Sequence, residues 1–477
     1  MTFIDREQEL KFLNSEYTRK GSSLVILYGR RRNGKTTLIN EFTKGKKTLY
    51  FLATEENENN NLENFKNRIF ETYKIDIKPE IKSFEDAFKL LIKIDKKPLI
   101  IIDEFQYLTM SNSAFASIFQ RIWDLYLQKT NAKVILCGSY IRMMEEQTLN
   151  YTSPLYGRRT GQIKLKQIKF KDYNKFYKNY DLKKLVEYYA VTGGVPRYIE
   201  IFNKEKDIYK AIENNILYRN SFLYEEPEFL LKNEVKDVGT YFSIIKVIAA
   251  GASKLSEISE KLNVKQTGLT NYLKTLIEIE ILRREVPITE TNPEKSKKSI
   301  YKINDNFIRF WFRFIYPNRD QIEMDNTEYV LNLIKRNFID NHVSYVYEDV
   351  CREMMLCDKK IHVDKVGKWW DKEDEIDVVG IDNDSKILYV GECKFTNKKV
   401  GMQVLNDLKR KAEKIKEYSD YKKVYCLFSI NGYEKELLKS GNNDIDTLLK
   451  WLFIKMIKAE VFEMDLMYEQ AKKYKKI

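Results

Sequence analysis

Short apolar runs alternate with helical patterns in the first third of the chain. Each run is bounded by polar residues or glycine, and the runs are Ser23–Tyr28, Thr48–Ala53, Pro98–Ile102 and Ala132–Cys137. Continuous apolar runs of this length are typical of strands that are buried on both faces of a parallel sheet. We therefore predict an α/β fold for residues 1–169, with helices on both sides of the sheet.

The pattern changes further along the chain. Residues 170–236 are helical and predict a lid behind the sheet domain. Residues 237–303 predict three helices and then two strands, which is the order of a winged helix-turn-helix. The expected helices and strands are Thr240–Ala250, Lys254–Leu262, Gln266–Glu280, Ile281–Ile288 and Lys298–Ile303. Residues 304–477 mix helix and strand and form the fourth predicted part.

Composition adds limits to this picture. With 477 residues, 43% of them hydrophobic and 32% charged, the chain is a normal folded protein that is too long for one core. The net charge of +13 is compatible with a nucleic-acid partner but does not require one. The five cysteines are scattered, and no run approaches the ~20 apolar residues of a membrane helix. We expect a soluble, cytoplasmic protein with reduced thiols and no membrane partner.

A glycine-containing loop follows the first predicted strand. It matches G-x-x-x-x-G-K-[ST] at every fixed position, and a helical segment follows it. In such a loop, backbone N–H groups converge on phosphate oxygens, while Lys35 contacts the β- and γ-phosphates and the Thr36 hydroxyl coordinates Mg²⁺. The sequence therefore predicts a nucleoside triphosphate site. Its loop residues are Gly29, Arg30, Arg31, Arg32, Asn33, Gly34, Lys35, Thr36 and Thr37.

Two acids end the third apolar run. Asp103 is expected to hold Mg²⁺, directly or through water, and Glu104 to polarise the attacking water. An Asp-Glu pair after a strand is often only a solvated loop. Its place downstream of the phosphate loop, with strand and helix segments between, favours the functional interpretation.

The first part resembles the archaeal-type AAA-related ATPases. Residues 3–10 match their Phe-x-x-Arg-Glu-x-x-Leu stretch, so the resemblance places Arg6 near the adenine and implies ATP rather than GTP. It also implies that Ser139 is the sensor-1 residue and that the segment with Arg158 and Arg159 supplies an arginine finger, with Arg158 as the first candidate. Gly193–Arg197 resembles the Gly-x-Pro sensor-2 segment, which makes Arg197 a further candidate for contact with the γ-phosphate. Each arginine is otherwise a solvated surface charge. Because such a finger acts across a subunit boundary, the resemblance is compatible with a homo-oligomer.

The third predicted helix of residues 237–303 is the candidate DNA-recognition helix. Polar residues near its N-terminal end could contact bases or phosphates, and lysines of the predicted wing (Lys295, Lys297, Lys298) could meet phosphates. The alternative is a protein-binding spacer, because a fold alone does not define a function. The recognition candidates are Lys265, Gln266, Thr267, Thr270 and Asn271.

A predicted hairpin in the fourth part brings two acids and a lysine together. If the turn is Asn383–Lys386, Asp377 lies opposite Glu392, and Lys394 shares the face of Glu392. Two carboxylates can bind Mg²⁺, and a lysine can orient the water that attacks a phosphodiester. The alternative is a solvated strand pair with surface charges.

This hairpin resembles the PD-(D/E)-x-K nuclease core. The resemblance assigns Asp377, Glu392 and Lys394 to the three motif positions and adds Glu348 from an upstream helix and Gln403 as a weaker position. The whole order of parts resembles a family that joins the archaeal-type ATPase to a C-terminal domain of unknown function. We expect an enzyme that hydrolyses ATP to ADP and phosphate and acts on or at DNA. The alternative is a nucleotide-controlled switch or scaffold whose nuclease-like α/β domain is catalytically silent.

Overall fold

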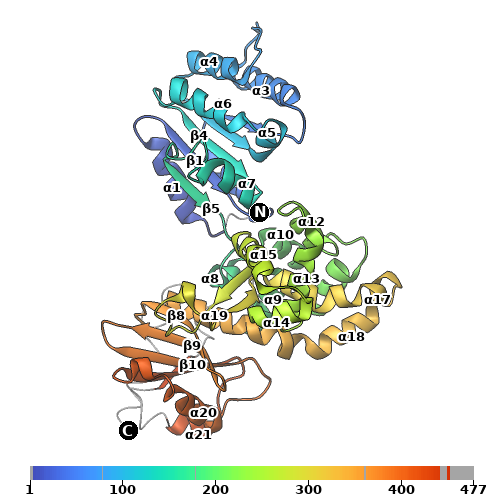
Figure 1. Ribbon diagram of the computed structural model, residues 1–477, viewed down its shortest axis with the longest axis vertical. Coiled ribbons are helices and arrows are strands. Elements are labelled where there is room, and N and C mark those ends of the chain that lie inside the picture. The colour runs from blue at the N-terminus through green and yellow to red at the C-terminus, as the bar shows by residue number, and fades with distance from the viewer. Residues whose placement is uncertain (1–3, 78, 178, 359–360, 441–447, 452–477) are drawn as a thin grey trace. The chain divides into compact units, whose positions relative to one another are not determined.

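The computed structural model describes residues 4–77, 79–177, 179–358, 361–440 and 448–451. The end of the fourth predicted part, residues 452–477, lies outside the described residues. The chain forms two compact units (Figure 1). Of the described residues, those in 4–168, 195–197 and 228–236 form the first unit, and those in 169–194, 198–227 and 237–451 form the second.

The first unit is built on a five-stranded sheet in the order β2-β3-β4-β1-β5, in which every pair is parallel. The parallel α/β arrangement predicted from the apolar runs is confirmed, and four strands lie within one residue of their predicted bounds. The fifth, β5, was missed because its sequence, Gly-Gln-Ile-Lys, carries one apolar residue. The strands are β1 (Ser23–Tyr28), β2 (Thr48–Leu52), β3 (Leu99–Asp103), β4 (Lys133–Gly138) and β5 (Gly161–Lys164).

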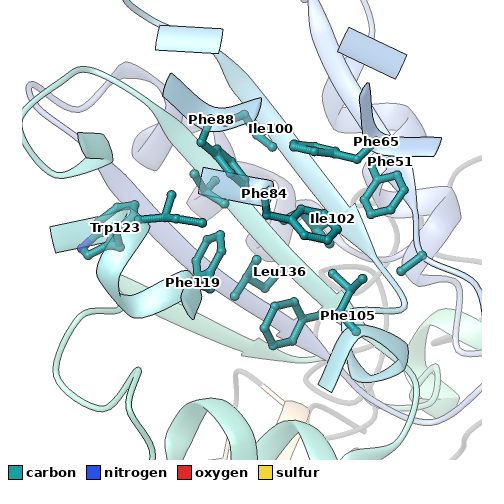
Figure 2. Close-up of a cluster of buried hydrophobic side chains, with 14 of the residues drawn as sticks. Phe51, Phe65, Phe84, Phe88, Ile100, Ile102, Phe105, Phe119, Trp123 and Leu136 are labelled. Atoms are coloured by element: carbon teal, nitrogen blue, oxygen red, sulfur yellow. The ribbon is translucent and has the colours of Figure 1, made fainter. Parts of the chain in front are cut away.

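Alternate strand residues enter two cores, one on each face of this sheet. Ile100 and Ile102 belong to an aromatic-rich core, whereas Ile101 belongs to the core on the opposite face. Figure 2 shows the aromatic-rich core, to which α3 (Glu58–Tyr73), α4 (Phe84–Ile94) and α6 (Phe115–Ile122) contribute. The helices α1 (Glu7–Thr18) and α2 (Lys35–Thr43) cover the other face. Two-sided coverage explains why the strands are continuously apolar.

The segment predicted as the lid is helical and is divided between the two units, with the start of α10 and most of α12 in the first. Its helices are α8 (Phe170–Tyr173), α9 (Leu182–Thr192), α10 (Pro196–Phe202), α11 (Ile208–Ile212) and α12 (Glu226–Lys232). Three further helices and an antiparallel strand pair follow in the expected order. These are α13 (Val238–Ala249), α14 (Leu255–Leu262), α15 (Gln266–Glu278), β6 (Leu282–Glu285) and β7 (Ile300–Ile303).

A helical segment then leads to a second five-stranded sheet, in the order β12-β11-β10-β9-β8. The helices that precede this sheet are α16 (Asn306–Phe310), α17 (Arg319–Glu323), α18 (Thr327–Phe338) and α19 (Ser344–Cys357). Two more, α20 (Met402–Ala412) and α21 (Lys435–Ser440), lie between its strands along the chain. Its strands are β8 (Lys365–Trp370), β9 (Glu375–Asp382), β10 (Ile387–Lys394), β11 (Lys422–Ser429) and β12 (Leu448–Trp451). The predicted turn is confirmed, because β9 pairs antiparallel with β10 and Asp382 lies opposite Ile387.

A half-buried ion pair joins the β6–β7 pair to the helix that packs on this second sheet. Arg283 of β6 donates to both carboxylate oxygens of Asp349 on α19, each over 2.8 Å. The Ile288 N–H donates to the Lys368 carbonyl of β8 over 2.9 Å, and Ile288 packs into the core of the second sheet. Since a half-buried ion pair and a backbone hydrogen bond connect them, the strand pair is anchored to α19 and β8.

Among the described residues, the helices are all too short or too polar to cross a membrane. The five cysteines are free thiols, and four of them are buried.

Candidate functional site

The loop between β1 and α2 turns at its two glycines. Gly29 has φ 148° and Gly34 has φ 88°, in the left-handed region that favours glycine. A Cβ on Gly29 would lie 2.4 Å from the Leu165 carbonyl oxygen, so this position admits no side chain. Gly34 directly precedes α2, whose free N–H groups and dipole favour an anion.

Lys35 fills the inside of this loop. Its Nζ donates to the Gly29 carbonyl over 2.7 Å and to the Arg30 carbonyl over 3.1 Å. Burial lowers the pKa of Lys35, while the negative charges of Asp103 and Glu104 act in the opposite direction. The next two residues, Thr36 and Thr37, are exposed. The loop therefore holds its cation among carbonyl groups and leaves two hydroxyl side chains open for a ligand.

Asp103 ends β3 and is held by two donors. The Tyr50 hydroxyl donates to Oδ2 over 2.6 Å, and the Glu104 N–H donates to Oδ1 over 2.9 Å. Burial and then the hydrogen bond to Asp103 raise the pKa of Tyr50, so its hydroxyl stays protonated as a donor. The sequence did not indicate Tyr50. The only signal was its place on the apolar run Thr48–Ala53, which pairs with β3.

Both carboxylate oxygens of Glu104 are also engaged. The Ser139 hydroxyl donates to Oε1 over 2.9 Å, and the Gln106 amide donates to Oε2 over 2.5 Å. The Glu104 backbone has φ 54°, an uncommon conformation for a side chain that is not glycine. The structure thus brings Ser139 and Glu104 together and adds Gln106, which sequence reasoning missed.

The arginines in and near the phosphate-binding loop have different hydrogen-bond partners. Arg31 donates to the hydroxyls of Tyr107 and Tyr140, over 3.0 and 3.1 Å. Arg6 donates to the Lys166 carbonyl over 2.5 Å and to the Asn33 carbonyl over 3.5 Å. Arg6 therefore ties the start of the chain to the loop. The remaining loop arginines are a buried Arg30 and a half-buried Arg32 with φ 71°.

Two later segments reach the same unit. Pro196 follows Gly193 and Gly194, and its Cγ lies 3.8 Å from the place of a Cβ on Gly34. Glu234 accepts a hydrogen bond from the Ile141 N–H over 3.0 Å, two residues after Ser139. Burial raises the pKa of Glu234 to about 7. Sequence reasoning missed Glu234, since it is far along the chain from β4.

Arg158 forms an ion pair within its own unit. Its Nε and Nη2 donate to the two carboxylate oxygens of Asp124, each over 2.8 Å, and its Nη1 donates to the Pro154 carbonyl. The hydrogen bonds to Asp124 raise the pKa of Arg158. A role as an arginine finger stays a prediction, and it requires this ion pair to open.

The candidate recognition residues lie at the start of α15. All five are exposed, whereas Leu269, Leu273 and Leu276 of the same helix are buried. The arrangement presents a polar surface that a partner can reach. The residues are Lys265, Gln266, Thr267, Thr270 and Asn271.

The acids and the lysine of the predicted hairpin lie in a larger buried cluster, which we call the charged cluster. Glu392 accepts a hydrogen bond from Lys394 over 2.7 Å, and Asp377 Oδ2 accepts one from the Cys393 N–H over 3.0 Å. Glu348 joins them from α19, while Gln403 is exposed. Burial and the neighbouring carboxylates raise the pKa values of Glu348 and Asp377.

Three residues of the charged cluster escaped sequence reasoning. Lys368 of β8 lies 3.1 Å from Glu348 and 3.8 Å from Asp377, and it also contacts Glu375 over 3.1 Å. Lys411 of α20 lies 3.6 Å from Glu392. Among the described residues, no three His, Cys, Asp or Glu side chains are arranged to hold a metal ion. As placed, the carboxylates have lysines and backbone N–H groups as partners.

The fold and the phosphate loop define an ATP-binding protein of the P-loop ATPase class. Residues 3–202 match an ATPase domain found predominantly in Archaea, and residues 311–414 match a domain of archaeal and bacterial proteins of unknown function. The uncharacterized protein MJECL04 of Methanocaldococcus jannaschii is 37% identical over 433 residues, which cover 89% of this chain and 95% of that protein. The chain belongs to this archaeal ATPase family.

Other similar proteins agree with this assignment. The uncharacterized ATP-binding protein MJ0801 of Methanocaldococcus jannaschii is 23% identical, over 60% of this chain and 90% of that protein. Among solved structures, the Walker-type ATPase PABY2304 of Pyrococcus abyssi has a TM-score of 0.50 and 22% identity, over 65% of this chain and 96% of that chain. This likeness shows the fold alone.

Proposed function

We propose that the protein is a Mg²⁺-dependent ATPase that acts at DNA. The observation that carries the ATPase proposal is the glycine-turned loop that holds the Lys35 ammonium group at the start of α2, within electrostatic reach of two acids. Asp103 and Glu104 act electrostatically on Lys35, and the exposed Thr36 hydroxyl follows it. A triphosphate would replace the carbonyl partners of Lys35, and Thr36 and Asp103 have the oxygen ligands that Mg²⁺ prefers. These residues fit a magnesium-nucleotide complex.

The test is ATP hydrolysis by the wild type and by Glu104→Gln. The variant keeps the size of the side chain and removes the charge that polarises water, so turnover should fall about 100-fold while ATP binding is retained. Glu63→Gln, which changes an exposed acid of α3, is the matched control and should hydrolyse ATP normally. Unchanged turnover in Glu104→Gln would refute the role of Glu104.

A nucleotide-controlled switch is the second candidate function. Both oxygens of Glu104 are held, by Ser139 and Gln106, and a held carboxylate favours slow turnover. Ser139→Ala distinguishes the two. If Ser139 restrains Glu104, the variant should hydrolyse ATP faster than the wild type. If Ser139 positions Glu104 for attack, it should be slower.

For the DNA contact, we propose that α13–β7 is a winged helix-turn-helix. Support comes from the order of its elements and from the exposed polar start of α15. Lys265→Ala should weaken DNA binding and reduce its salt dependence, because one phosphate contact is lost. Lys274→Ala, which removes an exposed lysine near the other end of α15, is the control. Absence of salt-sensitive DNA binding in the wild type would favour a protein-binding scaffold.

For the second sheet, we propose a PD-(D/E)-x-K nuclease-like domain. The antiparallel β9–β10 pair and the gathering of Glu348, Asp377, Glu392 and Lys394 support it. The contacts of Lys368 favour the version of this proposal in which the domain binds DNA without cutting it. Nicking of supercoiled DNA in Mg²⁺ that disappears in Asp377→Asn would show instead that the domain cuts.

A further inference from the structure

We propose that the Lys368 ammonium group takes the place of a metal ion in the charged cluster and prevents divalent metal ions from binding there. This inference rests on the nuclease-like assignment of the second sheet. It concerns a residue outside the Asp377, Glu392 and Lys394 pattern, contributed by the neighbouring strand β8.

The position of Lys368 is the first argument. Its Nζ lies 3.1 Å from Glu348 Oε2, 3.1 Å from Glu375 Oε2 and 3.8 Å from Asp377 Oδ1. A magnesium ion bound by Glu348 and Asp377 would need to stand about 2.1 Å from an oxygen of each. The ammonium group already occupies the space between these carboxylates, and two cations there would repel each other strongly.

The charge balance is the second argument. Two carboxylates that share a buried space normally need a cation. Here each carboxylate of the charged cluster has a cationic side chain of the same chain nearby. Lys368 contacts Glu348 and Asp377, and Lys394 and Lys411 contact Glu392. Arg352 adds a further positive charge 3.8 Å from Glu348. The charged cluster is therefore neutralised without a metal ion.

The anchoring of Lys368 is the third argument. Its carbonyl accepts a hydrogen bond from the Ile288 N–H, and the Cβ of Ile288 would lie 3.2 Å from a Cβ at Gly367. The Lys368 side chain is only 5% exposed. Backbone pairing and close packing on one side, and carboxylates on the other, keep the ammonium group in place.

Manganese binding to the full-length protein, without nucleotide, tests the proposal. The wild type should show no Mn²⁺ site that depends on Asp377, as measured by calorimetry or by electron paramagnetic resonance of free Mn²⁺. Lys368→Met keeps the aliphatic stem and removes the charge, so it should gain one Mn²⁺ site at least ~10-fold tighter than any binding by the wild type. The double variant Lys368→Met/Asp377→Asn should lose this site again.

Three controls make the result decisive. Lys422→Met removes an exposed lysine from β11 of the same sheet and should gain no site. Thermal unfolding checks that each variant is folded, and Lys368→Arg, which keeps a positive charge, should bind no Mn²⁺. A wild-type Mn²⁺ site that is lost in Asp377→Asn would overturn the proposal, and so would a folded Lys368→Met protein without a new site. ATP hydrolysis is measured separately, so a negative result in the Mn²⁺ experiment would not contradict the proposed ATPase function.

Discussion

Tyr50 on β2 donates a hydrogen bond to Asp103 on β3, with 2.6 Å between the phenol oxygen and Oδ2. The two strands are neighbours in the sheet, and the register places Leu52 beside Asp103. One oxygen of the carboxylate that we assign to magnesium is thus occupied by a neutral donor, and the other by the backbone. This geometry orients Asp103 before any ligand arrives.

We expect Tyr50→Phe to alter the magnesium dependence of ATP hydrolysis. Without the hydroxyl, Asp103 loses a charged hydrogen bond worth about 1.5–3 kcal/mol and its fixed orientation. The Mg²⁺ concentration for half-maximal turnover should change by at least about 3-fold, measured by titration at saturating ATP. Tyr107→Phe, which removes a hydroxyl from Arg31 instead, is the matched control. Equal magnesium dependence in wild type and Tyr50→Phe would show that Asp103 needs no such support.

Gly29→Ala should abolish nucleotide binding and destabilise the first unit. The added methyl would lie 2.4 Å from the Leu165 carbonyl oxygen, so either the loop or the segment after β5 must move. Gly45→Ala is a control with a similar backbone, since φ is 71° there and nothing lies near its Cβ. We expect Gly29→Ala to lower the free energy of unfolding by about 2 kcal/mol more than the control does. Denaturant unfolding measures both, and equal losses would contradict the packing argument.

The pKa of Glu234 predicts a pH dependence of stability. Burial raises it to about 7 in the folded state from 4.5, so the native protein holds this proton more tightly than the unfolded chain does. The stabilising contribution is complete below about pH 4.5 and is lost as the pH rises through 7. Glu234→Gln keeps an acceptor for the Ile141 N–H and cannot ionise.

We therefore expect the Glu234→Gln variant to gain stability over the wild type as the pH rises from 5 to 8. The difference should reach about 2–3 kcal/mol, which corresponds to the size of the pKa shift. Thermal unfolding of both proteins across this range measures it. Glu63→Gln should show no such trend, because Glu63 is exposed. Parallel stability curves for wild type and Glu234→Gln would contradict the prediction.

Asp349→Asn should destabilise the second unit. Asp349 accepts two hydrogen bonds from Arg283, and a third donor is Arg352. These charges outweigh burial and hold the pKa of Asp349 well below its ordinary value. The pair is half-buried, with side chains 26% and 28% exposed, so loss of these charge-assisted hydrogen bonds should cost about 1.5–3 kcal/mol.

The matched control is Asp325→Asn. Asp325 also accepts two hydrogen bonds from one arginine, Arg219, but the Asp325 side chain is 75% exposed. Its substitution should cost less than about 1 kcal/mol. Urea unfolding followed by tryptophan fluorescence compares the two variants. Similar losses would show that the link between β6 and α19 adds little to stability.

The sequence alone determined the phosphate loop, the order of most elements and the β9–β10 register. The loop is readable because its residues are contiguous, so backbone geometry and chemistry fall in one segment. The apolar runs fixed β1 to β4 because two-sided burial leaves a local signal. The strand β5 left no such signal, since a short edge strand can be mostly polar.

Only the tertiary structure decided which partners each functional side chain has. Tyr50 contacts Asp103 from β2, and Gln106 contacts Glu104 from the start of the helix after β3. Glu234 reaches the Ile141 N–H from a segment about 100 residues downstream of β4. Lys368 enters the charged cluster from β8, the strand next to β9 in the sheet. A side chain's partners depend on which strands become neighbours, and that follows from the packing of the whole sheet rather than from any local pattern.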